Sequence, residues 1–329
     1  MSGNSDRLYY ISIIRVYAML CIVFYHSLCF YAGTWGFICA DEITPIWRLV
    51  APPIVNIGLT LFVLVSGFLY GYLYNKGFYR NNKRFVLKKA YRLLIPYFVW
   101  GIWQIYCVPG LGKGWYSMLY GMSHLWFLLM LFEIFLIIVL LNKFDITGKT
   151  NLKVDVCLFV ISLIPYFISK YFLNAHSFLC VEVSLKYLPV FIAGIFSNKY
   201  CVHEKINSHF SKLGILIGGG ILLLISYLDI NLNNYLYTMV SLMIGIFLLS
   251  VTKSYRNSPI VSYLDDCCMG IYLLNQIVIF YLLLNDRVKD CLSNHVYLGP
   301  FIIFTVSFII PLIITKVIKK YKRLQFLLG

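Results

Sequence analysis

Ten long apolar runs are the feature of this 329-residue sequence that most constrains its fold. A helix needs about 20 mostly apolar residues to cross the hydrocarbon core of a bilayer. Sixty per cent of the residues are hydrophobic and 12% are charged, and a water-soluble fold of this size has too little interior to bury so much apolar surface. We therefore predict an all-α bundle of about ten membrane-spanning helices, and we exclude a soluble enzyme, a disordered chain and a nucleic-acid reader. The predicted spans are 10–33, 52–74, 93–108, 125–141, 154–172, 185–197, 213–228, 235–251, 264–284 and 298–316.

The chain reads as one membrane domain. No polar stretch exceeds a long loop and no run repeats another at a fixed period, so we expect residues 1–329 to form a single transmembrane domain without an appended soluble domain. The sixth run, 185–197, is short and contains Pro189 and Gly194. Because proline removes a helical hydrogen bond, we expect this helix to be kinked or broken.

The basic residues predict the orientation of the bundle. With ten spans, both termini lie on the same side of the membrane. If that side is the inside, 21 of the 28 Lys and Arg residues are inside, six are outside, and Arg15 alone falls within a span. This bias follows the positive-inside rule and predicts an N-in, C-in topology. It also accounts for the net charge of +15 without a nucleic-acid partner.

The first run carries two ionisable residues, Arg15 and His26, which are 11 positions apart. At 100° per residue this separation is three turns plus about 20°, so the two side chains share a helix face about 16 Å apart. A cation near the inner surface and an imidazole in the outer half favour a functional pair, because imidazole suits general-base chemistry near neutral pH. The alternative is that Arg15 reaches lipid phosphates and His26 hydrogen-bonds to a neighbouring helix.

A second histidine, His124, opens the fourth run on the predicted outer side. It should therefore lie at about the depth of His26, and two histidines at one level indicate a site near the outer leaflet. The alternative is an interfacial histidine beside Trp126 in the aromatic belt.

Three further polar residues lie inside apolar runs. Glu133 lies in the fourth run and needs a partner, either Arg15 or His26, or else stays protonated; a structural ion pair and a catalytic role are both open. Asn275 and Gln276 interrupt the ninth run, where amides often join transmembrane helices by hydrogen bonds.

A basic segment precedes the third run, with seven Lys and Arg residues between positions 75 and 92. If the helix begins early, Lys88 and Arg92 share a face because they are four residues apart. Such a cluster binds anionic lipid or the phosphates of a soluble cofactor. The ten cysteines include no CxxC pair, so we interpret them as small hydrophobes and expect no metal site.

Taken together, these residues resemble the integral-membrane acyltransferase-3 family. Five segments in family order carry the resemblance, although each alone is weak. They are Arg15 with His26, which match an Arg-x10-His signature; the run at 58–69, similar to FxxSGF; Lys89-Ala90-Tyr91-Arg92 leading to Pro96-Tyr97, similar to an RxxR stretch; His124-Leu125-Trp126-Phe127-Leu128, which matches HLWFL; and Gly270-Ile271-Tyr272-Leu273-Leu274, similar to GIYLxH. In two places this sequence departs from the family pattern: Lys89 replaces an arginine and Asn275 replaces the late histidine.

The resemblance implies an enzyme, an acyl-CoA-dependent O-acetyltransferase that uses acetyl-CoA as donor. The acceptor it implies is a hydroxyl of a surface saccharide or polysaccharide. The nucleotide phosphates would be held by Arg84, Lys88, Lys89 and Arg92, with Arg15 at the inner mouth of a channel through which the pantetheine arm reaches His26. His26 would act as general base, directly or through an acetyl-histidine. His124 would orient His26 or donate to the oxyanion, and Glu133 would hold a histidine tautomer.

Two other classes of function remain open from the sequence. A transporter or flippase for a lipid-linked saccharide or small solute would use the same polar residues as a substrate path. Transporters of this kind have paired repeats or broken helices at matching places, and only the short sixth run hints at one. A structural subunit of surface-polymer export would carry no chemistry. The bias of the basic residues fits the inner membrane of a bacterium, where we expect this multi-pass protein.

Overall fold

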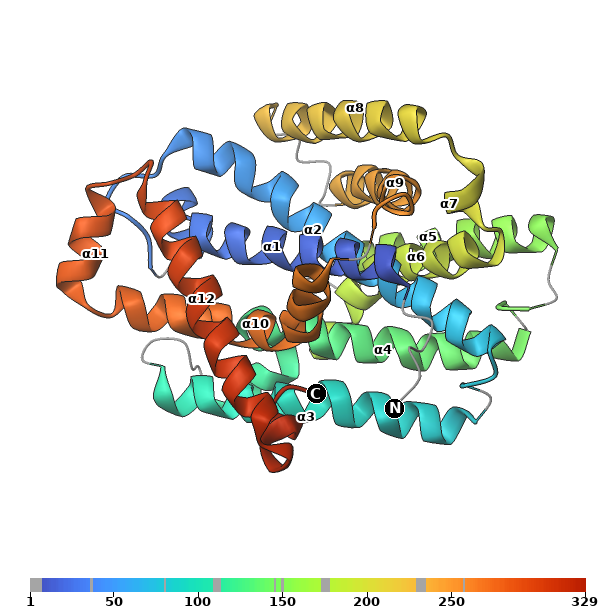
Figure 1. The fold of residues 1–329 in the computed structure, drawn as a ribbon, viewed down its shortest axis with the longest axis horizontal. Coiled ribbons are helices and arrows are strands. Elements are labelled where there is room, and N and C mark those ends of the chain that lie inside the picture. Colours follow the sequence, from blue (N-terminus) through green and yellow to red (C-terminus); the bar gives the residue numbers. More distant parts are fainter. Residues whose placement is uncertain are drawn as a thin grey trace.

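The structure, a computed structural model, describes residues 8–35, 38–79, 81–108, 114–144, 146–148, 151–172, 178–228, 235–256 and 258–329. Within these ranges the secondary structure is helical throughout (Figure 1). Ten α-helices have 16 residues or more, and each overlaps one of the ten predicted spans. They are α1 (Tyr9–Ala32), α2 (Pro45–Asn75), α3 (Asn82–Cys107), α4 (Trp126–Leu141), α5 (Leu152–Phe172), α6 (Val181–Lys199), α8 (Ser208–Tyr227), α9 (Tyr235–Thr252), α10 (Pro259–Leu283) and α12 (Gly299–Lys320).

Short helical segments connect the long ones. Two are α-helices, α7 (Val202–Lys205) and α11 (Asp286–Ser293); the 3-10 segments are η1 (Trp115–Tyr120), η2 (Ser123–Leu125), η3 (Asn142–Phe144), η4 (Phe178–Cys180) and η5 (Lys322–Leu327). By length and composition, eight segments are able to cross a membrane: α1, α2, α4 with the turns before it, α6 with η4, α8, α9, α10 and α12. The prediction of an all-α, multi-pass membrane bundle is confirmed. The N-in, C-in orientation stays a prediction.

α3 begins 11 residues before the predicted third span. Its first residue follows Asn81, whose side chain accepts a hydrogen bond from the backbone N–H of Arg84 at 3.0 Å. An asparagine at this position satisfies one of the unpaired N–H groups of the first turn. The basic segment is therefore the first part of a helix, which places Lys89 and Arg92 on one helical surface.

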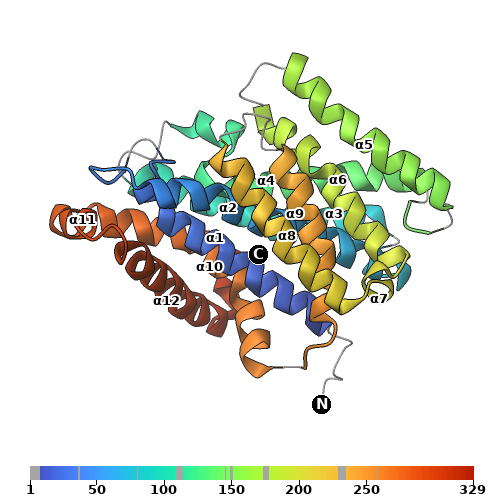
Figure 2. The same ribbon diagram turned by 90° about the horizontal axis from the view of Figure 1, so that it is seen from above.

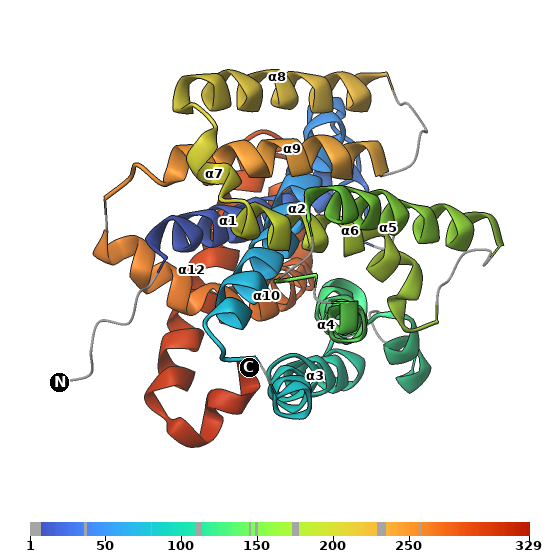
Figure 3. The same cartoon turned by 90° about the vertical axis from the view of Figure 1, so that its right-hand side faces the viewer.

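The helices pack around α2, which makes its most extensive contacts with α6 and α1. Figures 1 and 3 place α8 and α9 at one edge of the bundle and α3 at the opposite edge. Figure 2 shows α5 and α12 on opposite flanks of this arrangement. α1 and α2 run antiparallel, since the ring of Tyr10 lies 5.9 Å from that of Phe68 while Ile22 lies against Gly58.

Two glycines allow α2 and α6 to approach closely. A Cβ on Gly67 would lie 2.0 Å from the carbonyl oxygen of Phe191, and a Cβ on Gly194 would lie 2.2 Å from that of Leu64. Small residues let transmembrane helices pack backbone against backbone. α6 also runs unbroken from Val181 to Lys199 through Pro189, so the expectation of a broken sixth helix is wrong. The full contact with α2 holds the helix together across the proline.

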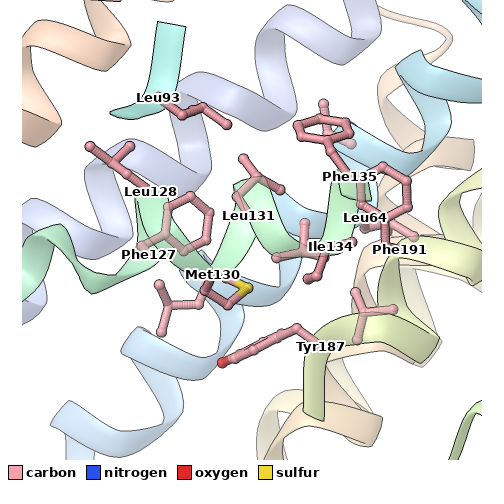
Figure 4. Packing of buried hydrophobic residues seen from close by; sticks show 14 of the residues in the cluster. Leu64, Leu93, Phe127, Leu128, Met130, Leu131, Ile134, Phe135, Tyr187 and Phe191 are labelled. Atoms are coloured by element: carbon pink, nitrogen blue, oxygen red, sulfur yellow. The ribbon is translucent and has the colours of Figure 1, made fainter. Parts of the chain in front are cut away.

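α4 is packed on both sides. Figure 4 shows Leu93 of α3 on one side of this helix and Tyr187 of α6 on the other. The buried side chains of α4 include Phe127, Leu128 and Met130, which fill the space between those neighbours. This packing fixes the position of the turn before α4, which carries His124.

Candidate functional site

His26 is buried in α1 and is held by Asn275 of α10. Its Nδ1 lies 2.5 Å from Asn275 Oδ1. The amide orientation is set by its own helix, because Asn275 Nδ2 donates to the carbonyls of Ile271 at 3.0 Å and Tyr272 at 2.6 Å. Since Oδ1 can only accept, His26 Nδ1 carries the proton and donates. The lone pair is therefore on Nε2 of His26, the nitrogen that is able to take a proton from a substrate.

His124 is buried beside His26, with ring centroids 5.7 Å apart and planes at 75°. Its Nε2 lies 3.1 Å from the carbonyl oxygen of Leu273, so Nε2 carries the proton. Its Nδ1 is buried without a hydrogen-bond partner in the described part of the chain. The backbone is held too: Gln276 Oε1 accepts from His124 N–H at 3.2 Å, and the Tyr272 hydroxyl donates to the His124 carbonyl.

The predicted depth of His124 agrees with this placement, since the two imidazoles are in contact. The histidines therefore present two lone pairs, on His26 Nε2 and on His124 Nδ1. Gln276 also accepts from the Ser123 hydroxyl at 2.9 Å. Both amides of α10 thus join helices, and the residues that they join carry the histidine pair.

Arg15 reaches the same helix as His26, as the spacing of 11 residues predicts. Its guanidinium forms an ion pair with Asp265 of α10 at 3.0 Å, and the Ser12 hydroxyl donates to the other oxygen of Asp265 at 2.8 Å. Asp265 and Asn275 are ten residues apart on α10, so α1 and α10 run parallel here. The sequence analysis missed Asp265, an acid at the edge of the ninth apolar run, which is a place where a buried partner for Arg15 was to be sought.

A cavity of about 230 Å³ takes in Arg15, Lys89 and Arg92. We call it the Arg15 cavity. The Lys89 ammonium lies 4.1 Å from the ring centroid of Phe135, and the rings of Tyr79 and Phe85 lie within 6 Å of it. Aromatic faces attract a cation but do not neutralise it. Lys89 and Arg92 form no ion pair with a described carboxylate, so the cavity has an excess of positive charge.

Tyr79, in the connection between α2 and α3, lines the same cavity. Burial raises the pKa of its hydroxyl, and the nearby Arg92 guanidinium opposes that rise. The phenol therefore stays neutral and offers a hydrogen-bond donor beside the two basic side chains.

Arg84 and Lys88 lie outside the Arg15 cavity, with exposed side chains. Of the four basic residues that were predicted to hold phosphates, the structure thus brings Lys89 and Arg92 together with Arg15. The reason is helical geometry: Lys89 and Arg92 face α4, and the neighbouring position 88 faces away. The predicted pairing of Lys88 with Arg92 on the site face is replaced by Lys89 with Arg92.

The Arg15 cavity ends close to the histidine pair without reaching it. Tyr272 lines the cavity, and its ring centroid lies 5.5 Å from that of His124. His26 is not among the lining residues. The predicted continuous passage from Arg15 to His26 is therefore interrupted in this structure, with Tyr272 at the end of its open part.

Glu133 faces a different helix. The Ser184 hydroxyl of α6 donates to its Oε2 at 2.6 Å. The described partners of Arg15, His26 and His124 are Asp265, Asn275 and Leu273. The structure therefore pairs Glu133 with a serine, and it places no contact between this carboxylate and either histidine.

The motif at Pro96-Tyr97 also acquires a role. The Tyr97 hydroxyl donates to the carbonyl of Met118 and accepts from Met122 N–H at 3.3 Å. These bonds hold the segment that leads into Ser123 and His124. The sequence analysis did not assign this contact, since Tyr97 and Met122 are far apart along the chain.

Comparison with known proteins agrees with the arrangement. No curated protein and no solved structure matches the chain. A family model described as an acyltransferase domain matches residues 8–318, which covers both histidines, the Arg15 cavity and all ten long helices except the last two residues of α12. The chain therefore belongs to the acyltransferase-3 family of integral-membrane acyltransferases.

Proposed function

We propose that this acyltransferase moves an acetyl group from acetyl-CoA to a hydroxyl of a surface saccharide, with His26 as general base. One observation carries the proposal: a basic cavity ends against a tyrosine that contacts a buried histidine pair. Cationic side chains suit the phosphates of a nucleotide, and an imidazole with a free lone pair suits proton removal from a hydroxyl.

Lys89, Arg92 and Arg15 are the residues we assign to the phosphates of the donor. Charge-assisted hydrogen bonds from such groups to phosphate are about twice as strong as neutral ones. The charged nucleotide would stay at the mouth of the Arg15 cavity, because ions enter hydrocarbon only at high cost. The thin pantetheine arm would follow the apolar lining toward Tyr272, and the thioester would reach His26 when this ring moves aside.

The chemistry follows from the tautomer of His26. Nε2 takes the proton from the acceptor hydroxyl while that oxygen attacks the thioester carbonyl carbon. Collapse of the tetrahedral intermediate breaks the C–S bond, and the imidazolium returns the proton to the thiolate of CoA. Transfer through an acetyl group on Nε2 would leave the same products.

His124 supports this step as an acceptor. Its Nε2–H is engaged with the Leu273 carbonyl, so its free Nδ1 is able to accept a hydrogen bond from the attacking hydroxyl. Donation to an oxyanion would require a second proton on this ring. We assign Glu133 no step, because Ser184 rather than a histidine is its partner.

A transporter for a lipid-linked saccharide is the competing function. Its sequence support was the expected break in the sixth helix, and α6 is continuous. The excess of basic residues on one side favours the inner membrane of a bacterium as the location, with the donor in the cytoplasm.

The deciding experiment uses the purified protein in liposomes with labelled acetyl-CoA and a saccharide acceptor. We expect label on the saccharide with the wild-type chain and a loss of about 10²- to 10⁴-fold in His26→Ala, the usual contribution of a general base. His295→Ala, which alters an exposed histidine, is the matched control and should be unaffected. Saccharide movement without labelling would support the transporter, and full activity in His26→Ala would reject the proposed base.

A further inference from the structure

A second cavity, of about 400 Å³, lies between α1, α2, α4, α5 and α6. We call it the Lys186 cavity. It combines aromatic rings with polar groups of several kinds, and the residues that the argument uses are Tyr25, Asn56, Trp126, Glu182, Lys186 and Tyr187. The notebook of residues with an expected role in the sequence analysis includes none of the six.

Lys186 is the unusual member of this lining. Its side chain is 8% exposed, and its ammonium lies 5.2 Å from the ring centroid of Tyr187. No ion pair joins it to a carboxylate in the part of the chain that the structure describes. A buried cation is costly unless it has polar partners. Because the Lys186 cavity is the space beside this ammonium, a ligand oxygen there would supply the missing partner.

Glu182 lies one helical turn before Lys186 and lines the same cavity. Residues four apart on a helix lie on one face, yet this pair does not make an ion pair within 4 Å. A donor and an acceptor held apart in this way fit one hydroxyl or two neighbouring hydroxyls between them. Asn56, buried and facing the same space, adds an amide.

The Lys186 cavity meets the Arg15 cavity at the level of the histidines. On α4, Trp126 lines the Lys186 cavity and the next residue, Phe127, lines the Arg15 cavity. On α1, Tyr25 is ten residues beyond Arg15, a rise of about 15 Å. The Tyr25 ring centroid lies 5.5 Å from that of His26, just as Tyr272 of the other cavity contacts His124. The two cavities therefore approach the histidine pair from opposite ends of the bundle.

We propose that the Lys186 cavity is the acceptor site and that it takes a neutral sugar ring. This inference rests on the proposed function, since it requires an acceptor hydroxyl at His26. Aromatic faces such as Trp126 pack against the C–H face of a sugar, while Lys186 donates to its oxygens and Glu182 accepts from its hydroxyls. One positive and one negative group balance, so an anionic sugar would meet the Glu182 carboxylate.

The test measures labelled-acetyl transfer by the full chain in liposomes with two acceptor probes, neutral cellotriose and anionic trigalacturonic acid. For Lys186→Met and Glu182→Gln we expect KM for cellotriose to rise about 10-fold or more, the usual effect of losing a hydrogen bond to a charged group. KM for acetyl-CoA should stay within about 2-fold, and Lys186→Arg should recover part of the loss. Lys212→Met, an exposed lysine at the start of α8, is the matched control.

Each outcome separates the site from the chemistry. A wild-type chain that consumes no acetyl-CoA contradicts the proposed function. Transfer to cellotriose that is insensitive to both substitutions, with acetyl-CoA kinetics intact, overturns the acceptor site alone. Preference for trigalacturonic acid, or consumption of acetyl-CoA with neither probe labelled, overturns the neutral-sugar class. A rise in both KM values to the same extent would mark a general structural effect and would also reject the site.

Discussion

At the scale of single residues, the site depends on which nitrogen of His26 holds the proton. An imidazole in isolation populates both neutral tautomers, and only the one with a free Nε2 suits the proposed base. Asn275 selects it, because both hydrogens of its amide are used by α10 backbone carbonyls and its oxygen must accept from Nδ1. The family pattern has a histidine at this position, and the asparagine performs the positioning without a second titratable group.

Removing this positioning bond should slow the chemical step. For Asn275→Ala we expect kcat for acetyl transfer to fall about 10- to 100-fold, a part of the total contribution of a general base, with KM for acetyl-CoA unchanged. A merely structural role would lower the amount of folded protein and leave kcat per folded molecule intact. Turnover normalised to folded protein, measured by size exclusion, separates the two. Unchanged kcat would remove Asn275 from the mechanism.

The basic segment provides a test with its own internal control. Lys89→Met removes a cation that lines the Arg15 cavity, and we expect KM for acetyl-CoA to rise about 10- to 100-fold because a charge-assisted bond to phosphate is lost. Lys88→Met removes the neighbouring exposed cation and should change KM less than 2-fold. Equal effects of the two substitutions would show that the segment acts through its overall charge on a membrane surface.

At the scale of elements, the close crossing of α2 and α6 determines the shape of the site. Ser66, which lines the Arg15 cavity, precedes Gly67, where the α6 backbone approaches. The same crossing places Lys186 and Tyr187 near the other end of α2. A short glycine-containing motif in α2 therefore has a physical explanation as a packing contact that holds two cavities in line.

A methyl group at this crossing should destabilise the bundle. Gly67→Ala would place a Cβ 2.0 Å from the Phe191 carbonyl oxygen, and such overpacking costs about 1–3 kcal/mol. Gly219→Ala is the matched control, since nothing lies within 4 Å of its Cβ position in α8. In detergent, thermal unfolding of the first variant should begin at lower temperature, and that of the second should be unchanged or later. Equal melting of both would contradict the tight crossing.

At the scale of the whole molecule, the two cavities suggest a division of the membrane into a donor side and an acceptor side. The Arg15 cavity lies toward the ends of α1 and α2 that the basic residues place inside. The Lys186 cavity lies toward the opposite ends. The reaction then requires no passage of the charged donor through the bilayer, because only its thin arm has to reach the histidine pair.

The orientation has a direct test in two natural cysteines, both exposed. Cys291 in α11 lies on the predicted outer side, and Cys201 between α6 and α7 lies on the predicted inner side. In intact cells, a membrane-impermeant maleimide should label a chain that keeps Cys291 alone and should spare a chain that keeps Cys201 alone. After the cells are opened, both should react. The reverse pattern would show that the N-terminus lies outside.

Much of the architecture was predictable from the sequence. Apolar runs long enough to span a bilayer identify the helices, since each must satisfy its backbone hydrogen bonds internally. Helical periodicity placed Arg15 and His26 on one face, and both side chains do reach α10. The start of α3 was missed because a charged segment shows no apolar run, although Asn81 was available as a capping signal.

Periodicity along one helix predicts which way a side chain points, but not which distant residue it meets. The sequence by itself determined the membrane class, the number of long helices and the residue types of the site. Only the tertiary structure decided that Asp265 pairs with Arg15, that Asn275 sets the tautomer of His26, that Glu133 turns to Ser184, and that Lys186 is buried beside a second cavity. The reason is physical: these contacts join residues from helices far apart in the chain, and they depend on how closely the glycines of α2 and α6 let the helices pack.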